Sequence, residues 1–138
     1  ALGGRVSEEL NFGDITTGPS NDLQVATALA RDMVTKYGMS EKLGPVALEG
    51  SGGRALFGGR GVDSRDYSED VSAKIDAEVS KIMNDAFARA REACTTHRNA
   101  LDAIANELVV QESIERDDFE KILIANGIMP KKKKEEVI

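Results

Sequence analysis

Residues 67–93 read YSEDVSAKIDAEVSKIMNDAFARAREA, and this stretch decides the fold class. Its apolar residues recur every three or four positions, which is the spacing of one face of an α-helix. They are Val71, Ile75, Val79, Ile82, Met83, Ala86, Phe87 and Ala90. Ser68 is a suitable N-cap for this helix, and Glu69 and Asp70 follow it at the positive end of the helix dipole. A helix from there to about residue 95 has a length of roughly 40 Å.

Two shorter helices are predicted upstream of this stretch. Leu2, Val6 and Leu10 are spaced by four residues, which predicts a helix that ends near Gly13. Apolar residues recur again between residues 23 and 37, and Gly38 follows them as a helix-ending residue. The start of this second helix matches a capping box, because Asn21 is followed three residues later by Gln24.

Two further helices are predicted downstream, over residues 101–109 and 119–123. Aromatic residues make up only 4% of the chain and Trp is absent, so the core must be built from aliphatic side chains, which favours helices over a β-sandwich. The sequence therefore predicts a mainly α fold, with a helical bundle over residues 68–128.

Residues 39–67 interrupt the helical periodicity and are rich in glycine. Short apolar runs at residues 46–48 and 55–57 are either the strands of a short β-hairpin or parts of a long flexible loop, and the pattern does not choose between them. The stretch GSGGRALFGGRG, residues 50–61, invites a nucleotide-binding reading. It lacks the Gly-Lys-Ser or Gly-Lys-Thr of a phosphate loop and the helix that should follow, so we expect a surface loop.

The net charge of −6 argues against nucleic acid as a partner, because phosphate binding requires a basic face. The basic run at residues 131–134 is followed directly by Glu135 and Glu136, and we expect residues 129–138 to form a solvated charged tail. No segment approaches the roughly 20 apolar residues of a membrane-spanning helix.

Cys94 and His97 are the only cysteine and histidine in the chain. A single cysteine excludes an internal disulfide and fits a reducing compartment. The two residues are three positions apart and could both touch one ion. No further ligand cluster is near them in the sequence, so we expect a surface histidine and an inert cysteine.

The remaining candidate for chemistry is TTGPSNDL, residues 16–23. Here Asp22 falls in the first turn of the second predicted helix, where the helix dipole stabilises a carboxylate. On local chemistry alone, Asp22 is an ordinary acidic residue at a helix start.

Motifs on both sides of Asp22 change how this residue is interpreted. Residues 2–47, LGGRVSEELNFGDITTGPSNDLQVATALARDMVTKYGMSEKLGPVA, resemble the peptidase domain of FtsH-type ATP-dependent zinc proteases. The resemblance continues through residues 67–93 and more loosely through ESIERDDFEKIL, residues 112–123. The joint occurrence of LGGR, TTGxxND and YGMSxKLGP is specific to that family.

The resemblance implies a site that this chain completes only in part. In the family, an H-E-x-x-H helix supplies two histidine ligands and the glutamate that activates water, and the Asp of TTGxxND is the third zinc ligand. Matching the motif assigns that ligand to Asp22, while Thr16, Thr17 and Asn21 shape the approach to it. The chain contains no H-E-x-x-H, so we expect both histidines and the catalytic glutamate upstream of Ala1, no catalytic residue here, and no activity of the chain alone.

The resemblance also implies the wider setting. The parent protein would be a membrane-anchored, ATP-dependent zinc metalloendopeptidase that degrades unfolded or damaged proteins as a homo-oligomer, a hexamer. It would act at the cytoplasmic face of a bacterial inner membrane, or at an organelle inner membrane, and touch the membrane only through N-terminal segments outside this soluble chain. Residues 1–37 would complete the metal site, and the helical region would support oligomerisation. The alternative is a stand-alone, non-enzymatic helical module for oligomerisation or partner binding.

Overall fold

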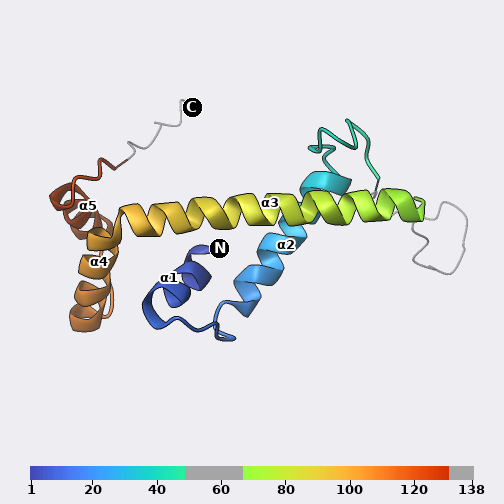
Figure 1. Cartoon of the computed structure of the whole chain (residues 1–138). Coiled ribbons are helices and arrows are strands. Elements are labelled where there is room, and N and C mark those ends of the chain that lie inside the picture. Colours follow the sequence, from blue (N-terminus) through green and yellow to red (C-terminus); the bar gives the residue numbers. More distant parts are fainter. Residues whose placement is uncertain (49–66, 131–138) are drawn as a thin grey trace, which may run out of the picture. The chain divides into compact units, whose positions relative to one another are not determined.

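The computed structural model describes residues 1–48 and 67–130, and within these residues the fold is built from five α-helices and no strand. In chain order the helices are α1 (Gly3–Phe12), α2 (Ser20–Thr35), α3 (Glu69–Thr96), α4 (Arg98–Gln111) and α5 (Arg116–Ala125) (Figure 1). The chain divides into two compact units, Ala1–Arg91 and Glu92–Ile138. The mainly α fold expected from the sequence is confirmed, whereas the possible hairpin and the glycine-rich stretch 50–61 lie largely or wholly outside the described residues.

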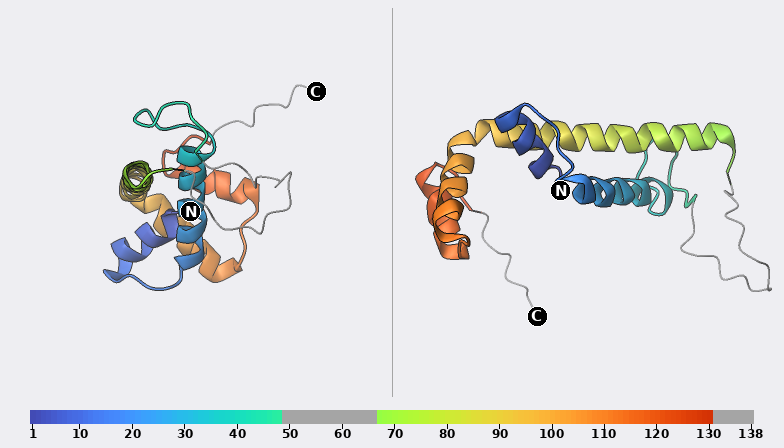
Figure 2. Two further views of the ribbon diagram at one scale, coloured as in Figure 1. Left: turned by 90° about the vertical axis from the view of Figure 1, so that its right-hand side faces the viewer. Right: turned by 90° about the horizontal axis from the view of Figure 1, so that it is seen from below.

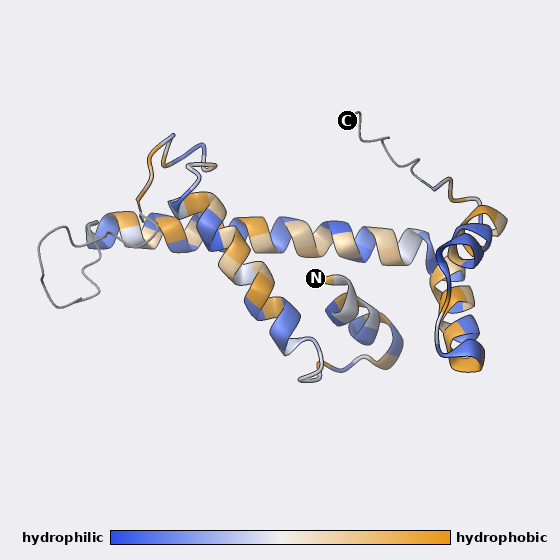
Figure 3. Cartoon of the chain, turned by 180° about the vertical axis from the view of Figure 1, so that it is seen from behind, coloured by the Kyte–Doolittle hydropathy of each residue, from blue (hydrophilic) through white to orange (hydrophobic). Residues whose placement is uncertain are grey.

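Helix α3 forms as the sequence predicts, over 28 residues without a break (Figures 1 and 2). The hydroxyl of Ser68 accepts a hydrogen bond from the backbone N–H of Val71 at 3.3 Å, which is the N-cap interaction expected at its start. Hydrophobic and hydrophilic residues alternate along the helix (Figure 3), as expected for an amphipathic helix with one face on the core. No helix among the described residues is long and apolar enough to span a membrane.

The first unit holds α1, α2 and most of α3, and its core is small. The largest fully buried side chains are Val6 from α1, Val34 and Thr35 from α2, and Ile75 from α3. Helix α1 ends at Gly13, which has a φ of 69° and so takes the left-handed conformation that suits glycine. Leu23, Leu29 and Tyr37, which the periodicity assigned to the apolar face of α2, are instead exposed by 37%, 58% and 61%.

The start of α2 differs from the sequence prediction. The helix begins at Ser20, its N-cap is Pro19, and no side chain caps it. The predicted capping box of Asn21 and Gln24 is therefore wrong, since both residues lie inside the helix. The reason is local: proline has its φ already fixed near the helical value, so the chain enters the helix two residues earlier than the capping pattern suggests.

The loop after α2 is fixed to α3 by a buried carboxylate. Glu78 is only 6% exposed, and its Oε2 accepts a hydrogen bond of 2.8 Å from the hydroxyl of Ser40. Its Oε1 lies 3.2 Å from the ammonium nitrogen of Lys42. These contacts lower the pKa of Glu78, the Ser40 hydrogen bond being the largest cause, so this carboxyl stays ionised in the fold. The motif YGMSEKLGP thus holds the end of α2 against α3.

In the second unit, α4 and α5 pack against each other as a helical hairpin. Its exposed apolar side chains include Val109, Val110, Ile124 and Met129, while Ala100 is the buried residue of α4. Val109 and Val110 are the most exposed of these apolar side chains within the two helices, at 82% and 79%.

Candidate metal-ligand site

Asp22 lies in the first turn of α2, as the sequence predicted. Its side chain is exposed, and within residues 1–48 and 67–130 it takes part in no hydrogen bond or ion pair. Both carboxylate oxygens are therefore available to an ion.

The turn that leads into α2 is held by a second carboxylate, that of Glu8 in α1. The hydroxyl of Thr16 lies 2.9 and 2.8 Å from the two oxygens of Glu8, to which it donates. The backbone N–H of Thr16 also points at Glu8 Oε2, at 3.4 Å. The same hydroxyl accepts a hydrogen bond of 3.1 Å from the N–H of Gly18. Helix α1 thereby fixes the loop that sets where α2 begins.

The backbone continues this arrangement from the loop into the helix. The N–H of Ser20 donates to the carbonyl of Thr17 at 3.1 Å, and the N–H of Leu23 donates to the carbonyl of Pro19 at 3.0 Å. A side chain at Gly18 would place its Cβ 3.1 Å from Glu8 Oε1, so the carboxylate of Glu8 would have to shift slightly to admit it. The direction of Asp22 is thus set by Glu8 and by the turn, since the residues before it have defined partners.

Helix α1 is in turn attached to α3. Arg91 of α3 forms an ion pair with Glu9, and its guanidinium lies 5.5 Å from the centre of the Phe87 ring. Arg5 of α1 lies over the same ring at 5.8 Å. Two cation–π contacts and an ion pair therefore connect α1 to the long helix, next to the residue that holds the Thr16 turn.

The other two candidates from the sequence belong to the second unit. His97 is the exposed N-cap residue of α4, and Cys94 is half-buried. Among residues 1–48 and 67–130 no three His, Cys, Asp or Glu side chains are grouped so that they could hold a metal ion. Asp22 therefore fits a zinc site as one oxygen ligand, and the described residues do not complete one.

Sequence reasoning did not single out Glu8 or Glu78. Glu8 is eight residues from Thr16, across a turn whose path no local pattern predicts. Glu78 had a usable signal, because it is three residues after the buried Ile75 and therefore on the same helix face. Thr16 was expected to shape the approach to Asp22, which stays a prediction; the structure shows its hydroxyl bound to Glu8.

Comparison with known proteins agrees with these motifs. Residues 1–122 match the model of peptidase family M41. The chain is 43% identical over 129 residues to the ATP-dependent zinc metalloprotease FtsH 3 of Synechocystis sp., covering 92% of this chain and 21% of that protein. It is 46% identical over 123 residues to FtsH of Thermotoga maritima, an alignment that covers 88% of this chain and 20% of that protein. It is 41% identical over 132 residues to FtsH of Bacillus subtilis, an alignment that covers 95% of this chain and 21% of that protein. The chain spans about a fifth of the length of these curated relatives. It belongs to peptidase family M41 and is of the FtsH zinc metalloprotease type.

Proposed function

We propose that this chain acts as part of an ATP-dependent zinc metalloendopeptidase and contributes one zinc ligand, Asp22. The observation that carries the proposal is an exposed carboxylate without protein partners in the described residues, on a helix start that Glu8 and Thr16 hold in place. An oxygen ligand of this kind suits zinc. The two histidines and the glutamate of an H-E-x-x-H helix, absent from this sequence, would complete the site.

When bound, zinc would supply Lewis-acid activation of water and of the peptide carbonyl. The contribution of this chain is orientation. Glu8 holds Thr16, the Thr16 turn sets the first residues of α2, and α2 presents Asp22 to the ion. With one ligand and no catalytic residue, the 138-residue chain alone has no proteolytic activity.

ATP dependence and zinc follow the printed names of the relatives, which are ATP-dependent zinc metalloproteases, and the rest of the proposal follows the family resemblance of the sequence motifs. Unfolded or damaged proteins would be the substrates, ATP hydrolysis and membrane attachment would belong to other segments, and the working form would be a homo-oligomer such as a hexamer. The exposed Val109, Val110 and Ile124 of the α4–α5 hairpin support an association surface in this region.

The test replaces Asp22 in a full-length protein that contains this sequence. Asp22→Ala should abolish protein degradation and reduce the bound zinc by at least about tenfold, while ATP hydrolysis continues. Asp14→Asn, at an exposed acidic residue in the loop before α2, is the matched control and should keep protein degradation, bound zinc and ATP hydrolysis. Degradation that persists at the wild-type rate in Asp22→Ala would contradict the ligand assignment.

A further inference from the structure

Helix α2 carries Asp22 at its start, but the contacts that join it to α3 lie at its other end. The buried residues of α2 are all in its C-terminal half: Ala30, Val34 and Thr35. Ile75 and Glu78 are the buried residues of α3. Within residues 1–48 and 67–130, the polar contacts from α2 and its following loop to α3 are also at this end.

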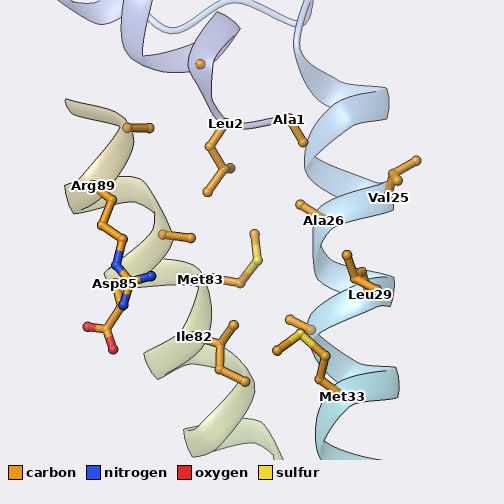
Figure 4. Close-up of a pocket in the computed structure, with 14 residues that line it drawn as sticks. Ala1, Leu2, Val25, Ala26, Leu29, Met33, Ile82, Met83, Asp85 and Arg89 are labelled. Atoms are coloured by element: carbon orange, nitrogen blue, oxygen red, sulfur yellow. The ribbon is translucent and has the colours of Figure 1, made fainter. Parts of the chain in front are cut away.

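Toward the start of α2, a groove of about 630 Å³ lies between α2 and α3, beside Ala1 and Leu2 (Figure 4). All of its walls belong to the first unit. The side chains that line it are mainly apolar, among them Val25, Leu29, Met33, Ile82, Met83 and Ala86. Since the groove separates the two helices here, the direction of α2 relative to α3 depends on how the end of α2 is held.

That end is held by a buried carboxylate and two groups from the loop after α2, which we call the Glu78 clamp: Glu78, Ser40 and Lys42. The Ser40 hydroxyl donates to Glu78 Oε2 at 2.8 Å and accepts from the backbone N–H of Leu43 at 3.2 Å. The ammonium nitrogen of Lys42 lies 3.2 Å from Glu78 Oε1. A buried carboxylate that loses such a partner has no water to replace it, so the geometry of the clamp is strongly favoured.

The loop that supplies the clamp is itself attached to the last turns of α2. The N–H of Met39 donates to the carbonyl of Met33 at 2.9 Å, and the N–H of Leu48 donates to the carbonyl of Thr35 at 2.7 Å. A contact of this loop with α3 therefore acts on the helix, because loop and helix are joined by backbone hydrogen bonds.

A second polar contact between the two helices is weaker. The guanidinium of Arg31 lies 3.8 Å from a carboxylate oxygen of Asp76, whose side chain is 72% exposed. An ion pair so open to water contributes little. The Glu78 clamp is thus the polar contact that fixes the end of α2 on α3.

A small rotation at the clamp has a large effect at Asp22. At 1.5 Å per residue, Asp22 lies about 18 Å along the helix from Val34. A tilt of about 3° there would move Asp22 by roughly 1 Å. Metal–ligand distances tolerate only about 0.2 Å, and a displacement of about 1 Å caused by a distant substitution can lower a rate by roughly a hundredfold.

We propose that Glu78 is a positioning residue for the zinc ligand: it holds the end of α2 on α3 and so sets where Asp22 meets the ion, without touching either. The Glu8–Thr16 contact holds the other end of α2, so the helix is fixed at two points. The proposal rests on the proposed function in that Asp22 is taken as a ligand.

The test breaks the clamp from both sides in a full-length protein that contains this sequence, with Glu78→Gln and Ser40→Ala. Zinc affinity is measured by competition with a chelator, and kcat and KM are measured with unfolded casein, together with ATP hydrolysis and melting temperature. Glu41→Gln, at an exposed glutamate of the same loop, is the matched control. Ala100→Gly, at the buried residue of α4 in the second unit, is a destabilised control.

Both clamp variants should bind zinc at least about fivefold more weakly and lose at least about tenfold in kcat, with KM within about twofold and ATP hydrolysis unchanged. Glu41→Gln should match the wild type. Ala100→Gly should melt at a lower temperature and keep its zinc affinity, because a loss of stability alone does not move Asp22.

Wild-type zinc affinity in both clamp variants would overturn the proposal, and so would an equal loss of zinc in Ala100→Gly. The two proposals fail separately. If Asp22→Ala keeps its zinc, the ligand assignment fails; if Asp22→Ala loses zinc while Glu78→Gln and Ser40→Ala keep it, only the positioning role of Glu78 fails.

Discussion

At the scale of single residues, three carboxylates in different surroundings lie around α2 in the first unit. Asp22 has no protein partner in the described residues and is available to an ion, whereas Glu8 is engaged by Thr16 and sets the turn before α2. Glu78 is buried and holds the loop after the same helix. One helix is thus fixed at both ends by glutamates that belong to other helices.

The Thr16 contact can be tested by removing its hydroxyl. Thr16→Val should lower the free energy of unfolding by about 0.5–1.5 kcal/mol, the usual net contribution of one or two hydrogen bonds, and Glu8→Gln should act in the same direction. Thr17→Val is the control, because the hydroxyl of Thr17 forms no hydrogen bond in the described structure. Urea unfolding measures all three. A Thr16→Val protein as stable as Thr17→Val would show that the Glu8 contact does not hold the turn.

Glu78 predicts a dependence of stability on pH. Its pKa in the fold is lower than the ordinary value of 4.5, first because of the Ser40 hydrogen bond and then because of Lys42. The unfolded chain therefore takes up the proton first as the pH falls. The stabilisation by Glu78 is complete above pH 4.5 and is lost as the pH falls from there through the folded pKa.

The measurement is urea unfolding between neutral pH and the acid range. Glu78→Gln should be less stable than the wild type at neutral pH, and this difference should shrink as the carboxyl of the wild type becomes protonated. Glu41→Gln, an exposed glutamate in the same loop, should follow the wild-type curve. A constant difference between Glu78→Gln and the wild type at every pH would contradict the assignment.

At the scale of helices, one glycine caps α1 and another lies three residues beyond the end of α2, in the same backbone conformation but in different surroundings. Gly13 and Gly38 have φ values of 69° and 60°. A Cβ on Gly13 would meet nothing within 4 Å among the described residues, whereas a Cβ on Gly38 would lie 3.2 Å from backbone atoms of Pro45. A side chain at position 38 would therefore meet two obstacles, the left-handed backbone conformation and the close backbone of Pro45, whereas a side chain at position 13 would meet only the first.

Replacing each glycine by alanine separates the two effects. Gly13→Ala should destabilise the protein by about 1–2 kcal/mol, the cost of the left-handed conformation for a residue with a Cβ. Gly38→Ala should cost clearly more, because the backbone of Pro45 must also move. Thermal and urea unfolding compare the two variants directly. Equal losses of unfolding free energy would mean that the backbone around Pro45 moves without a measurable cost.

At the scale of the whole molecule, the described residues supply one of the proposed zinc ligands, Asp22. They contain no group of three His, Cys, Asp or Glu side chains that could hold a metal ion. The 138-residue chain should therefore retain less than about one tenth of an equivalent of zinc after dialysis and should cleave no protein substrate, because one carboxylate holds the ion far too weakly. Metal analysis and a protease assay check this, with a full-length FtsH-type protein as the positive control. Zinc retained at one equivalent and lost on Asp22→Asn would contradict it.

The sequence alone determined the order of the five helices among the described residues, and it placed the start of α3 at Ser68 and the end of α1 at Gly13, while α4 and α5 begin three residues earlier than expected. Helical periodicity, the Ser68 cap and the Gly13 stop are interactions between neighbours a few positions apart, so they can be read directly from a linear pattern. The position of Asp22 in the first turn of α2 followed from the same pattern, and its assignment as a ligand came from motif resemblance and stays a prediction. The Asn21 cap failed because proline and threonine upstream decided where the helix begins.

Only the tertiary structure decided which polar side chains meet. Glu8 reaches Thr16 across a turn, Glu78 reaches Ser40 across 38 residues, and Arg91 reaches Glu9 across 82. The groove beside Ala1 is of the same kind, because it exists only where α2 and α3 face each other. The physical reason is one of range: backbone hydrogen bonds within a helix depend on neighbours in sequence, while the partner of a carboxylate or an apolar face depends on how the helices pack.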